Sequence, residues 1–308
     1  MHVGAPKTAT TFLQSSLNHN RPILNKLGYD TLVPSQIRES DFYVYLHLIN
    51  TKKELYITEN EAIKDFKSTI SEIESNKIII SEEGILHNLM PSETSQGSFG
   101  GVKEAAKAIK SVISNKTTII LTIRNQVNFI ESSYKHKVKW RLYDQSLEEY
   151  LRTEVDIKKL SWKFVIDTFE ELFPGKVKVI PYELIKTSQE TYFDHFLKSC
   201  GIQYSKNRLS FELNEQVENE AMPDNQANFM RIINKAYKEN LPIKLKQILD
   251  IISFTENIFK YEPRRKLPSF KLGESFACEI KEIYKEENVE ILNKYCTKKD
   301  VLEVLKYY

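Results

Sequence analysis

The stretch Met1-His2-Val3-Gly4-Ala5-Pro6-Lys7-Thr8-Ala9-Thr10-Thr11-Phe12-Leu13-Gln14 decides the expected fold. A short apolar strand leads into Gly4, and an apolar-periodic run extends over residues 12–27 after the small residues. This order predicts a strand, a tight turn and the N-terminus of a helix, where backbone N–H groups and the helix dipole favour an anion. Lys7 adds a positive charge, and the threonine hydroxyls add hydrogen-bond donors. The stretch therefore predicts a phosphate or sulfate site.

The turn is not a Walker loop, because Pro6 stands where that pattern has Gly directly before its Lys. It resembles instead the loop that binds the 5′-phosphosulfate group in sulfotransferases using 3′-phosphoadenosine 5′-phosphosulfate (PAPS). That loop reads Pro-Lys-Thr/Ser-Gly-Thr-Thr, followed by an apolar or aromatic residue. An ordinary strand-to-helix turn with an unrelated lysine is the alternative. The resemblance implies that these residues bind the sulfuryl donor: Pro6, Lys7, Thr8, Ala9, Thr10, Thr11 and Phe12.

One residue departs from the family pattern. Ala9 occupies the position at which the family usually has Gly. An alanine costs little there if the backbone is already helical, whereas a positive φ would strain it. The cost of this departure therefore depends on the backbone conformation of Ala9.

Composition narrows the class of protein. The chain has 308 residues, of which 41% are hydrophobic and 28% are charged, so it can bury a core and is not expected to be disordered. A net charge of +2 indicates no general basic surface for nucleic acid. Cys200, Cys278 and Cys296 lie far apart without metal spacing, so buried thiols in a reducing compartment are the expectation.

No apolar run approaches the roughly 20 residues of a transmembrane helix, and no basic-then-apolar leader stands at the start. We therefore expect a cytoplasmic enzyme, and its abundant Lys, Ile, Asn and Tyr are typical of an AT-rich bacterial genome. Residues 1–308 are expected to form one sulfotransferase-type domain. Its α/β donor-binding core would span residues 1–205, with residues 206–308 as helices packed on that core. The opening strand is short, which leaves open whether strand residues precede Met1.

Strand-like and helix-like segments alternate along the chain. Continuous apolar runs predict buried strands at 77–81 and 117–123. A short strand closed by Pro34 is expected at 29–33, and another strand at 176–181. Helical periodicity is found at 12–27, 41–50, 60–75, 102–113, 126–138, 146–154, 162–173, 191–200, 223–237, 242–259, 274–287 and 298–306. Residues 91–101, rich in Ser, Thr and Gly, predict a mobile loop. The alternation predicts an α/β fold with a parallel β-sheet flanked by helices and a helical C-terminal extension. The resemblance implies the P-loop NTPase-like sulfotransferase fold.

A second motif begins at the end of the strand over 117–123. Arg124 follows this strand directly, and the carboxyl ends of parallel strands are where such sheets bind ligands. Its guanidinium can fork onto a phosphate, and Ser132, about two helical turns later, can offer a hydroxyl. The family's 3′-phosphate motif is similar, with Arg-Asn-Pro followed by Ser-Ser-Tyr, although Gln126 replaces the Pro here. The alternative is an arginine that caps a strand and a serine within an amphipathic helix.

Two weaker resemblances follow. Residues 177–186 are similar to the family's strand ending in Tyr-Glu-Asp-Leu, although Leu184 replaces the Asp. The resemblance implies that Tyr182 lies near the adenine, and a tyrosine that only packs in the core is an equal interpretation. A basic C-terminal loop usually gives the family's last phosphate contact. Arg264, Arg265 and Lys266 form the comparable cluster here, but the family's Arg-Lys-Gly is absent, so a solvated charge run is an equal interpretation.

Sulfuryl transfer to an acceptor oxygen requires a base near that oxygen. Glu82 is the first candidate, because it follows the strand over 77–81, and the family uses a Glu or His at a comparable place. Glu83 stays open as an alternative by a one-residue slip, and His47, on a helix, is the runner-up. The structural alternatives are two carboxylates at a helix N-terminus and a structural histidine.

The sequence thus predicts a PAPS-dependent sulfotransferase. The resemblance implies that Lys7 contacts the oxygen bridging sulfur and phosphorus, that Arg124 and Ser132 hold the 3′-phosphate, and that Glu82 takes the proton. No metal is implied. The acceptor would offer a hydroxyl or amine, with a saccharide favoured over another small hydroxylated molecule. A nucleotide or small-molecule kinase and a non-catalytic anion-binding module are the alternatives.

Overall fold

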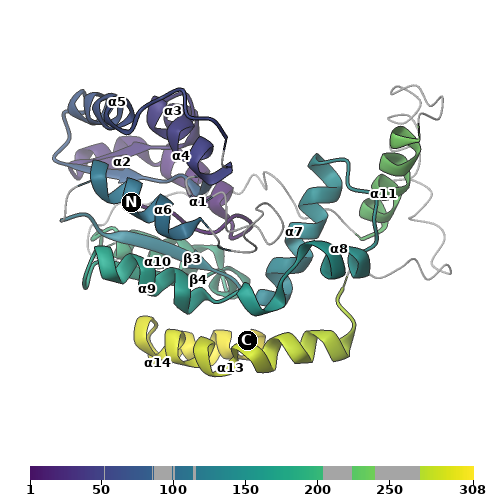
Figure 1. Ribbon diagram of the computed structural model, residues 1–308. Helices are drawn as coiled ribbons and strands as arrows, with labels where there is room; N and C mark the ends of the chain where they lie inside the picture. The colour runs from purple at the N-terminus through teal and green to yellow at the C-terminus, as the bar shows by residue number, and fades with distance from the viewer. Residues whose placement is uncertain are drawn as a thin grey trace.

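The computed structural model describes residues 1–51, 53–84, 86, 99, 101–113, 116–203, 224–239 and 271–308. Helices flank short parallel strands in this part of the chain (Figure 1). Strand β1 pairs in parallel with β2, and β3 pairs in parallel with β4. The α/β class with parallel strands flanked by helices is therefore confirmed. The bounds of the strands are β1 (Tyr29–Leu32), β2 (Lys77–Ile80), β3 (Ile119–Ile123) and β4 (Val177–Pro181).

The first residues of the chain join the two strand pairs. His2 makes parallel bridges to Ser81, directly after β2, and to Ile120 of β3. The His2 amide donates to Ile80 O at 2.7 Å, and the Val3 amide donates to Ile120 O at 3.0 Å. The sheet therefore has the order β1, β2, residues 1–5, β3, β4. This order places the loop that follows residues 1–5 at the middle of the sheet's carboxyl edge.

The helix predicted over residues 12–27 is divided into α1 (Thr10–His19) and α2 (Arg21–Lys26). Pro22 lies in the first turn of α2, where its missing N–H is tolerated, but it cannot continue the hydrogen-bond ladder of α1. The side chain of Asn20, between the helices, donates to Ser16 O at 2.7 Å. The prediction of one continuous helix was wrong for this reason.

Most of the other predicted helices in the described residues are found within a few residues of their expected ends, and α3 is an addition too short to show periodicity. The helix predicted over 274–287 was too short, because α13 continues to Tyr295. The predicted helix over 242–259 lies outside the described residues, as does most of the predicted loop over 91–101. The observed bounds are α3 (Pro34–Ile37), α4 (Asp41–Thr51), α5 (Glu59–Ser71), α6 (Val102–Val112), α7 (Gln126–Trp140), α8 (Leu147–Glu154), α9 (Trp162–Leu172), α10 (Gln189–Ser199), α11 (Asp224–Lys238), α13 (Glu274–Tyr295) and α14 (Lys298–Val304), with 3-10 turns η2 (Ile157–Lys159), η3 (Tyr182–Lys186) and η5 (Leu305–Tyr307).

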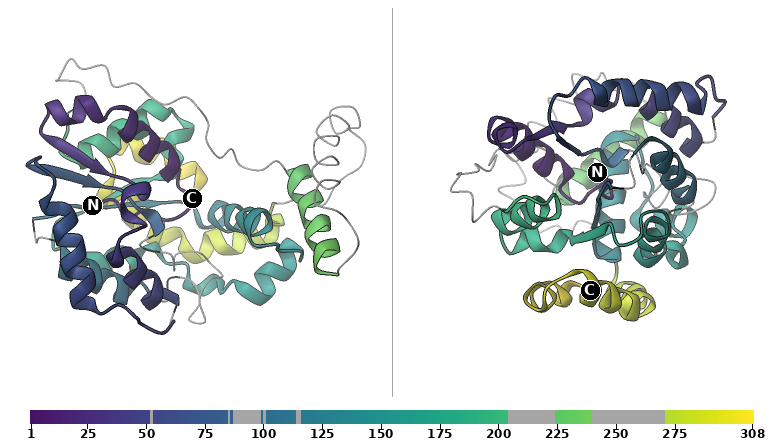
Figure 2. Two further views of the ribbon diagram at one scale, coloured as in Figure 1. Left: turned by 90° about the horizontal axis from the view of Figure 1, so that it is seen from above. Right: turned by 90° about the vertical axis from the view of Figure 1, so that its left-hand side faces the viewer.

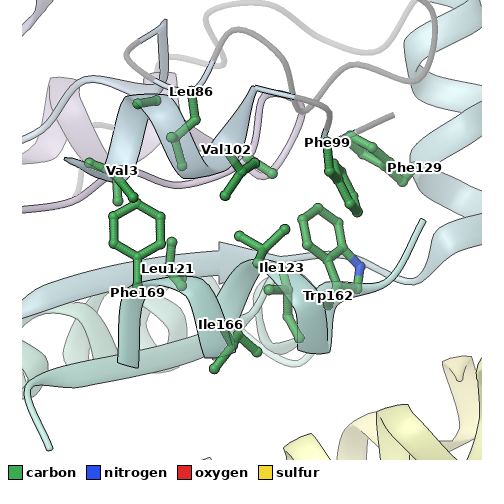
Figure 3. Packing of buried hydrophobic residues seen from close by; sticks show 14 of the residues in the cluster. Val3, Leu86, Phe99, Val102, Leu121, Ile123, Phe129, Trp162, Ile166 and Phe169 are labelled. Carbon is green, nitrogen blue, oxygen red and sulfur yellow. The ribbon is translucent and has the colours of Figure 1, made fainter. Parts of the chain in front are cut away.

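The core lies between the sheet and the helices on its faces. Every residue of β3 is buried, as its continuous apolar sequence predicts. Figure 3 shows Leu121 and Ile123 of this strand facing Ile166 and Phe169 of α9. Trp162 packs at the end of this cluster, with ring centroids 4.8 Å from Phe99 and 5.3 Å from Phe129, which lie at the ligand edge of the sheet. The packed core therefore reaches the predicted site.

The C-terminal helices α13 and α14 lie along one side of the α/β core (Figure 2). Ile280, Tyr284 and Ile291 of α13 are buried in the same apolar cluster as β3 and α9. The Tyr284 hydroxyl donates to Ile157 O at 2.7 Å and accepts from the Leu160 amide at 2.8 Å. These contacts tie α13 to the core. Within the described ranges, no helix is long and apolar enough to cross a bilayer.

Candidate active site

The loop begins at a glycine that has no room for a side chain. A Cβ atom on Gly4 would collide with the Thr122 hydroxyl oxygen and would lie 2.5 Å from His2 Nε2. One residue later, the Ala5 amide donates to Thr122 O at 3.1 Å. Gly4 therefore allows the central strand to lie close against β3 up to the point where the loop turns.

Two loop residues have left-handed backbone conformations. Lys7 has φ 67° and Ala9 has φ 57°, and Ala9 is the N-cap residue of α1. A left-handed conformation costs a residue with a Cβ roughly 1–2 kcal/mol, whereas glycine adopts it freely. The structure thus places Ala9 in the conformation that strains alanine. The glycine in the family pattern is the residue that this backbone favours.

Thr8 points into the protein. Its Oγ1 donates to Ala5 O at 2.5 Å and lies 2.7 Å from Thr122 Oγ1, and its side chain is buried. The Tyr192 hydroxyl donates to Thr8 O at 2.7 Å. The Thr8 side chain therefore braces the loop against β3, and its backbone N–H is the group left for a ligand.

A buried histidine supports the loop from below. His2 Nδ1 lies 2.9 Å from Ser81 Oγ, and His2 Nε2 lies 3.3 Å from Thr122 Oγ1. Burial lowers the pKa of His2 to about 3, so the imidazole is neutral at pH 7. The network His2, Ser81, Thr122 and Thr8 thus connects the end of β2 to the loop through β3.

The remaining loop residues lie at the start of α1 or just before it. Thr10 is buried, whereas Pro6 and Thr11 are half-buried. The Phe12 ring packs against Tyr192 and Phe193, with centroids 6.5 and 6.4 Å apart. Phe12 therefore anchors α1 on α10, which leaves the first turn of α1 for backbone contacts.

Lys7 lies among other cations. Its Nζ is 3.3 Å from His136 Nδ1, on α7. Its pKa is lowered, first by burial and then by the charges of Arg124 and Lys139, while the charge of Glu83 acts in the opposite direction. A partly buried ammonium beside other cations is suited to an anionic ligand. The sequence reasoning missed His136, and its position one helical turn after Ser132 is the signal that would have suggested it.

Arg124 contacts the same loop. Its Nη1 donates to Lys7 O at 2.6 Å, and its guanidinium carbon lies 4.4 Å from the centroid of the Tyr182 ring. Its Nε is buried with no hydrogen-bond partner in the described part of the chain. The Trp162 indole donates to Arg124 O at 2.7 Å, which fixes the backbone there. Lys7, Arg124 and Tyr182, which were predicted from three separate segments, thus lie together, and half-buried Ser132 follows on α7.

Two carboxylates lie on the other side of the loop. Glu82 has no exposed surface; its two oxygens each accept from Arg38 at 3.0 Å, and one also accepts from the Gly84 amide at 2.7 Å. Burial raises the pKa of Glu82, and the bonds from Arg38 oppose that rise. Glu83 accepts from Gln14 Nε2 at 2.6 Å. Arg38 Nη2 also donates to Glu83 Oε1, at 3.5 Å, so Arg38 contacts both carboxylates. Glu83 keeps exposed surface and its charge acts on Lys7, whereas Glu82 is fully enclosed.

His47 lies half-buried on α4, outside the contacts described above. Arg264, Arg265 and Lys266 lie outside the described residues. No group of three His, Cys, Asp or Glu side chains that could hold a metal ion is found in the ranges that the structure describes.

A further buried carboxylate supports the start of α7. Glu183 Oε1 accepts from the Asn125 amide at 3.0 Å, and Oε2 accepts from the Tyr308 hydroxyl at 2.8 Å. Burial raises the pKa of Glu183. Glu183 therefore fixes the backbone directly after Arg124, a role that its place after β4 does not reveal in the sequence.

No protein-family model matches the chain, and no curated protein sequence matches it. Among solved structures, a sulfotransferase from Alicyclobacillus acidocaldarius is similar with a TM-score of 0.45 and 13% sequence identity, over 70% of this chain and 84% of that chain. A likeness of this size does not bear on the activity, which has to be argued from the residues.

Proposed function

We propose that the chain is a sulfotransferase that uses PAPS as its sulfuryl donor. The observation that carries this proposal is the convergence of Lys7 and Arg124 at the sheet edge, with Arg124 Nε buried and unpaired among the described residues. Among the described residues neither Lys7 nor Arg124 makes an ion pair with a carboxylate, and partly buried cations without one favour an anionic ligand. A nucleotide with phosphate at both its 5′ and 3′ positions has charge in two places, one for each cation.

The proposal assigns a part to each residue around the loop. Lys7 neutralises the oxygen that bridges sulfur and phosphorus as the bond between that oxygen and sulfur breaks. The amides of Thr8, Thr10 and Thr11 bind the 5′-phosphate at the N-terminus of α1. Arg124 binds the 3′-phosphate together with half-buried Ser132. As in phosphoryl transfer, positioning and electrostatic stabilisation supply most of the rate.

Tyr182 has a separate part in the same proposal. The Arg124 guanidinium lies over its ring, which aligns the guanidinium plane while leaving the ring edge for the adenine. Arginine stacks on aromatic faces in this way while keeping its donors directed at a phosphate.

We assign the base to Glu83 and a structural role to Glu82. Glu82 is held by Arg38 and the Gly84 amide, so its oxygens are occupied. Glu83 accepts from Gln14 and, at 3.5 Å, from Arg38, but it keeps exposed surface and its charge acts on Lys7. When the acceptor oxygen forms its bond to sulfur, its proton goes to Glu83, and the leaving group is adenosine 3′,5′-bisphosphate. A saccharide hydroxyl is the acceptor that we favour.

A thermal-shift comparison of adenosine 3′,5′-bisphosphate, AMP and ATP–Mg²⁺ tests the proposal. A ligand that binds only the folded state raises the melting temperature by mass action. The bisphosphate should raise it most, because only this ligand places a phosphate on Arg124. Preference for ATP–Mg²⁺ would indicate a kinase and would overturn the proposal. Strong binding of the bisphosphate without turnover of PAPS on any acceptor would indicate a non-catalytic anion-binding module.

A further inference from the structure

A cavity of about 780 Å³ lies on the side of α7 away from Lys7. It is bounded by α7, α8, α11 and the start of α13, and its volume is within the range of roughly 300–1,000 Å³ typical of small-molecule sites. His136 and Lys139 of α7 interact with Lys7, whereas Tyr134 lines the cavity. The cavity is thus separated from the proposed donor site by the thickness of one helix.

The floor of the cavity is apolar. Its lining side chains belong to the buried core or pack against it, and the polar end of Tyr134 is already used, because its hydroxyl donates to Gln145 O at 2.7 Å. Such a floor favours a hydrocarbon chain over water. The apolar lining residues are Tyr134, Leu147, Leu151, Val155, Ile157, Leu272 and Phe276.

The charged lining residues are mostly basic. Arg152, Arg231 and Lys271 line the cavity, and Glu148 is the acidic residue among them. Arg152 is paired with Glu149 at 2.6 Å, and Lys271 interacts electrostatically with Glu131. Arg231 is half-buried and makes no ion pair with a carboxylate in the described part of the chain; its charge acts on Tyr134, inside the cavity. A half-buried guanidinium in such surroundings attracts an anion that can accept two hydrogen bonds.

We propose that this cavity binds a fatty carboxylate. Its hydrocarbon chain lies on the apolar floor, and its carboxylate forms a bidentate ion pair with Arg231. The site is distinct from the proposed donor site, and its occupation does not require that the chain transfers sulfuryl groups. The backbone amide of Leu272, on the cavity wall, donates to Glu131 at 2.8 Å, and Glu131 also interacts with Arg124. Occupation of the cavity is therefore expected to act on α7, where Ser132 lies.

Calorimetric titration of the full chain with octanoate, octan-1-ol and acetate tests this proposal. Octanoate should bind at one site. Acetate lacks the hydrocarbon chain and should bind at least about tenfold more weakly. Octan-1-ol lacks the charge and should also bind at least about tenfold more weakly, since charge-assisted hydrogen bonds contribute about that much. Equal binding of octanoate and octan-1-ol would overturn the assignment of the carboxylate to Arg231.

Three variants make the test specific to this cavity. Arg231→Gln should weaken octanoate binding about tenfold or more, whereas Arg152→Gln, a matched loss of charge at a residue already paired, should change it less than about threefold. Ser275→Trp places a large side chain at an exposed lining position and should abolish binding without removing any core contact. Binding by each variant is compared with that of the unaltered chain only where the two have the same circular dichroism spectrum. Octanoate binding that survives Ser275→Trp would show that it occupies another site.

Competition separates this site from the proposed donor site. Adenosine 3′,5′-bisphosphate should leave the stoichiometry of octanoate binding unchanged, whether or not the bisphosphate itself binds. Displacement of octanoate by the bisphosphate would show that the cavity belongs to the nucleotide, and would overturn the proposal of a separate site.

Discussion

The two halves of the sheet end in opposite charge. The half formed by β3 and β4 ends in Arg124 and Tyr182, whereas the half formed by β1 and β2 ends near Glu82 and Glu83. Lys7 follows the central strand and lies between them; burial and then the charge of Arg124 lower its pKa, whereas the charge of Glu83 raises it. Under the proposed function, one edge of one sheet thus binds an anion on one side and accepts a proton on the other. The first two of the following predictions test this difference, and the next two test the central strand and loop between the halves.

The largest effect is expected at the two carboxylates. Glu83→Gln should lower turnover about 10²–10⁴-fold, the usual contribution of a general base, while adenosine 3′,5′-bisphosphate binding is retained. Glu82→Gln is the matched control and should act mainly on the fold, because Glu82 is held by Arg38. Its free energy of unfolding should fall by about 1–3 kcal/mol. Turnover is measured as bisphosphate release from PAPS with an oligosaccharide acceptor.

Two outcomes would contradict this assignment. Normal turnover of Glu83→Gln together with an inactive but folded Glu82→Gln would make Glu82 the base. Full activity in both variants, with His47→Ala inactive, would move the proton to His47.

A somewhat smaller effect is expected for Lys7→Ala. Under the proposed function, Lys7 neutralises charge that develops as the bond to the leaving group breaks, so turnover should fall about 10²–10³-fold, and bisphosphate affinity should fall less. His136→Ala is a useful comparison, because it removes the neighbour of Lys7 Nζ and leaves the ammonium in place. If affinity collapses in Lys7→Ala while turnover at saturation is intact, Lys7 only anchors the ground state.

The third prediction concerns acid stability. The pKa of His2 is about 3 in the folded chain against an ordinary value of 6.5, so below pH 6.5 the unfolded chain binds more protons than the folded chain. Stability should therefore fall as the pH falls from about 6.5 toward 3. His2→Gln should flatten this part of the stability curve, as measured by urea unfolding across the range. An equally steep curve in His2→Gln would show that other groups control it.

The smallest effect is expected at Ala9. Ala9→Gly relieves a left-handed alanine, and part of the gain is lost to the greater freedom of glycine in the unfolded chain, so the free energy of unfolding should rise by up to about 1 kcal/mol. Ala277→Gly, within α13, is the control and should lower it by about 1 kcal/mol. A decrease in stability for Ala9→Gly would show that the loop is not strained at this position.

The features that could be predicted from the sequence are those that depend on local patterns. Apolar runs in the sequence predict β2, β3 and β4. Arg124 and Tyr182 follow β3 and β4, and the carboxyl ends of parallel strands lie at one edge of a sheet, so both residues were expected at that edge. Pro22, which divides the first predicted helix, was a usable signal. The backbone conformation of Ala9 could not be predicted, because the same loop sequence is compatible with a helical or a left-handed backbone at this residue.

Other site residues depend on tertiary contacts and carry no local signal. Arg38 reaches Glu82 from the end of α3, 44 residues away in sequence, and Glu183 reaches Asn125 from 58 residues away. Sequence alone could not choose between Glu82 and Glu83, because a shift of a single residue decides which carboxylate is fully enclosed and which keeps exposed surface. That choice depends on the direction in which the chain leaves β2.

The central claim is that Arg124 binds a 3′-phosphate. Calorimetric titration of the chain and of Arg124→Gln with adenosine 3′,5′-bisphosphate and AMP tests it most directly, because the four dissociation constants form a double-mutant cycle. The chain should prefer the bisphosphate by about tenfold or more, since charge-assisted hydrogen bonds contribute about 1.5–3 kcal/mol, and Arg124→Gln should lose that preference. Equal binding of the two nucleotides by the unaltered chain, or a preference that persists in folded Arg124→Gln, would contradict the claim.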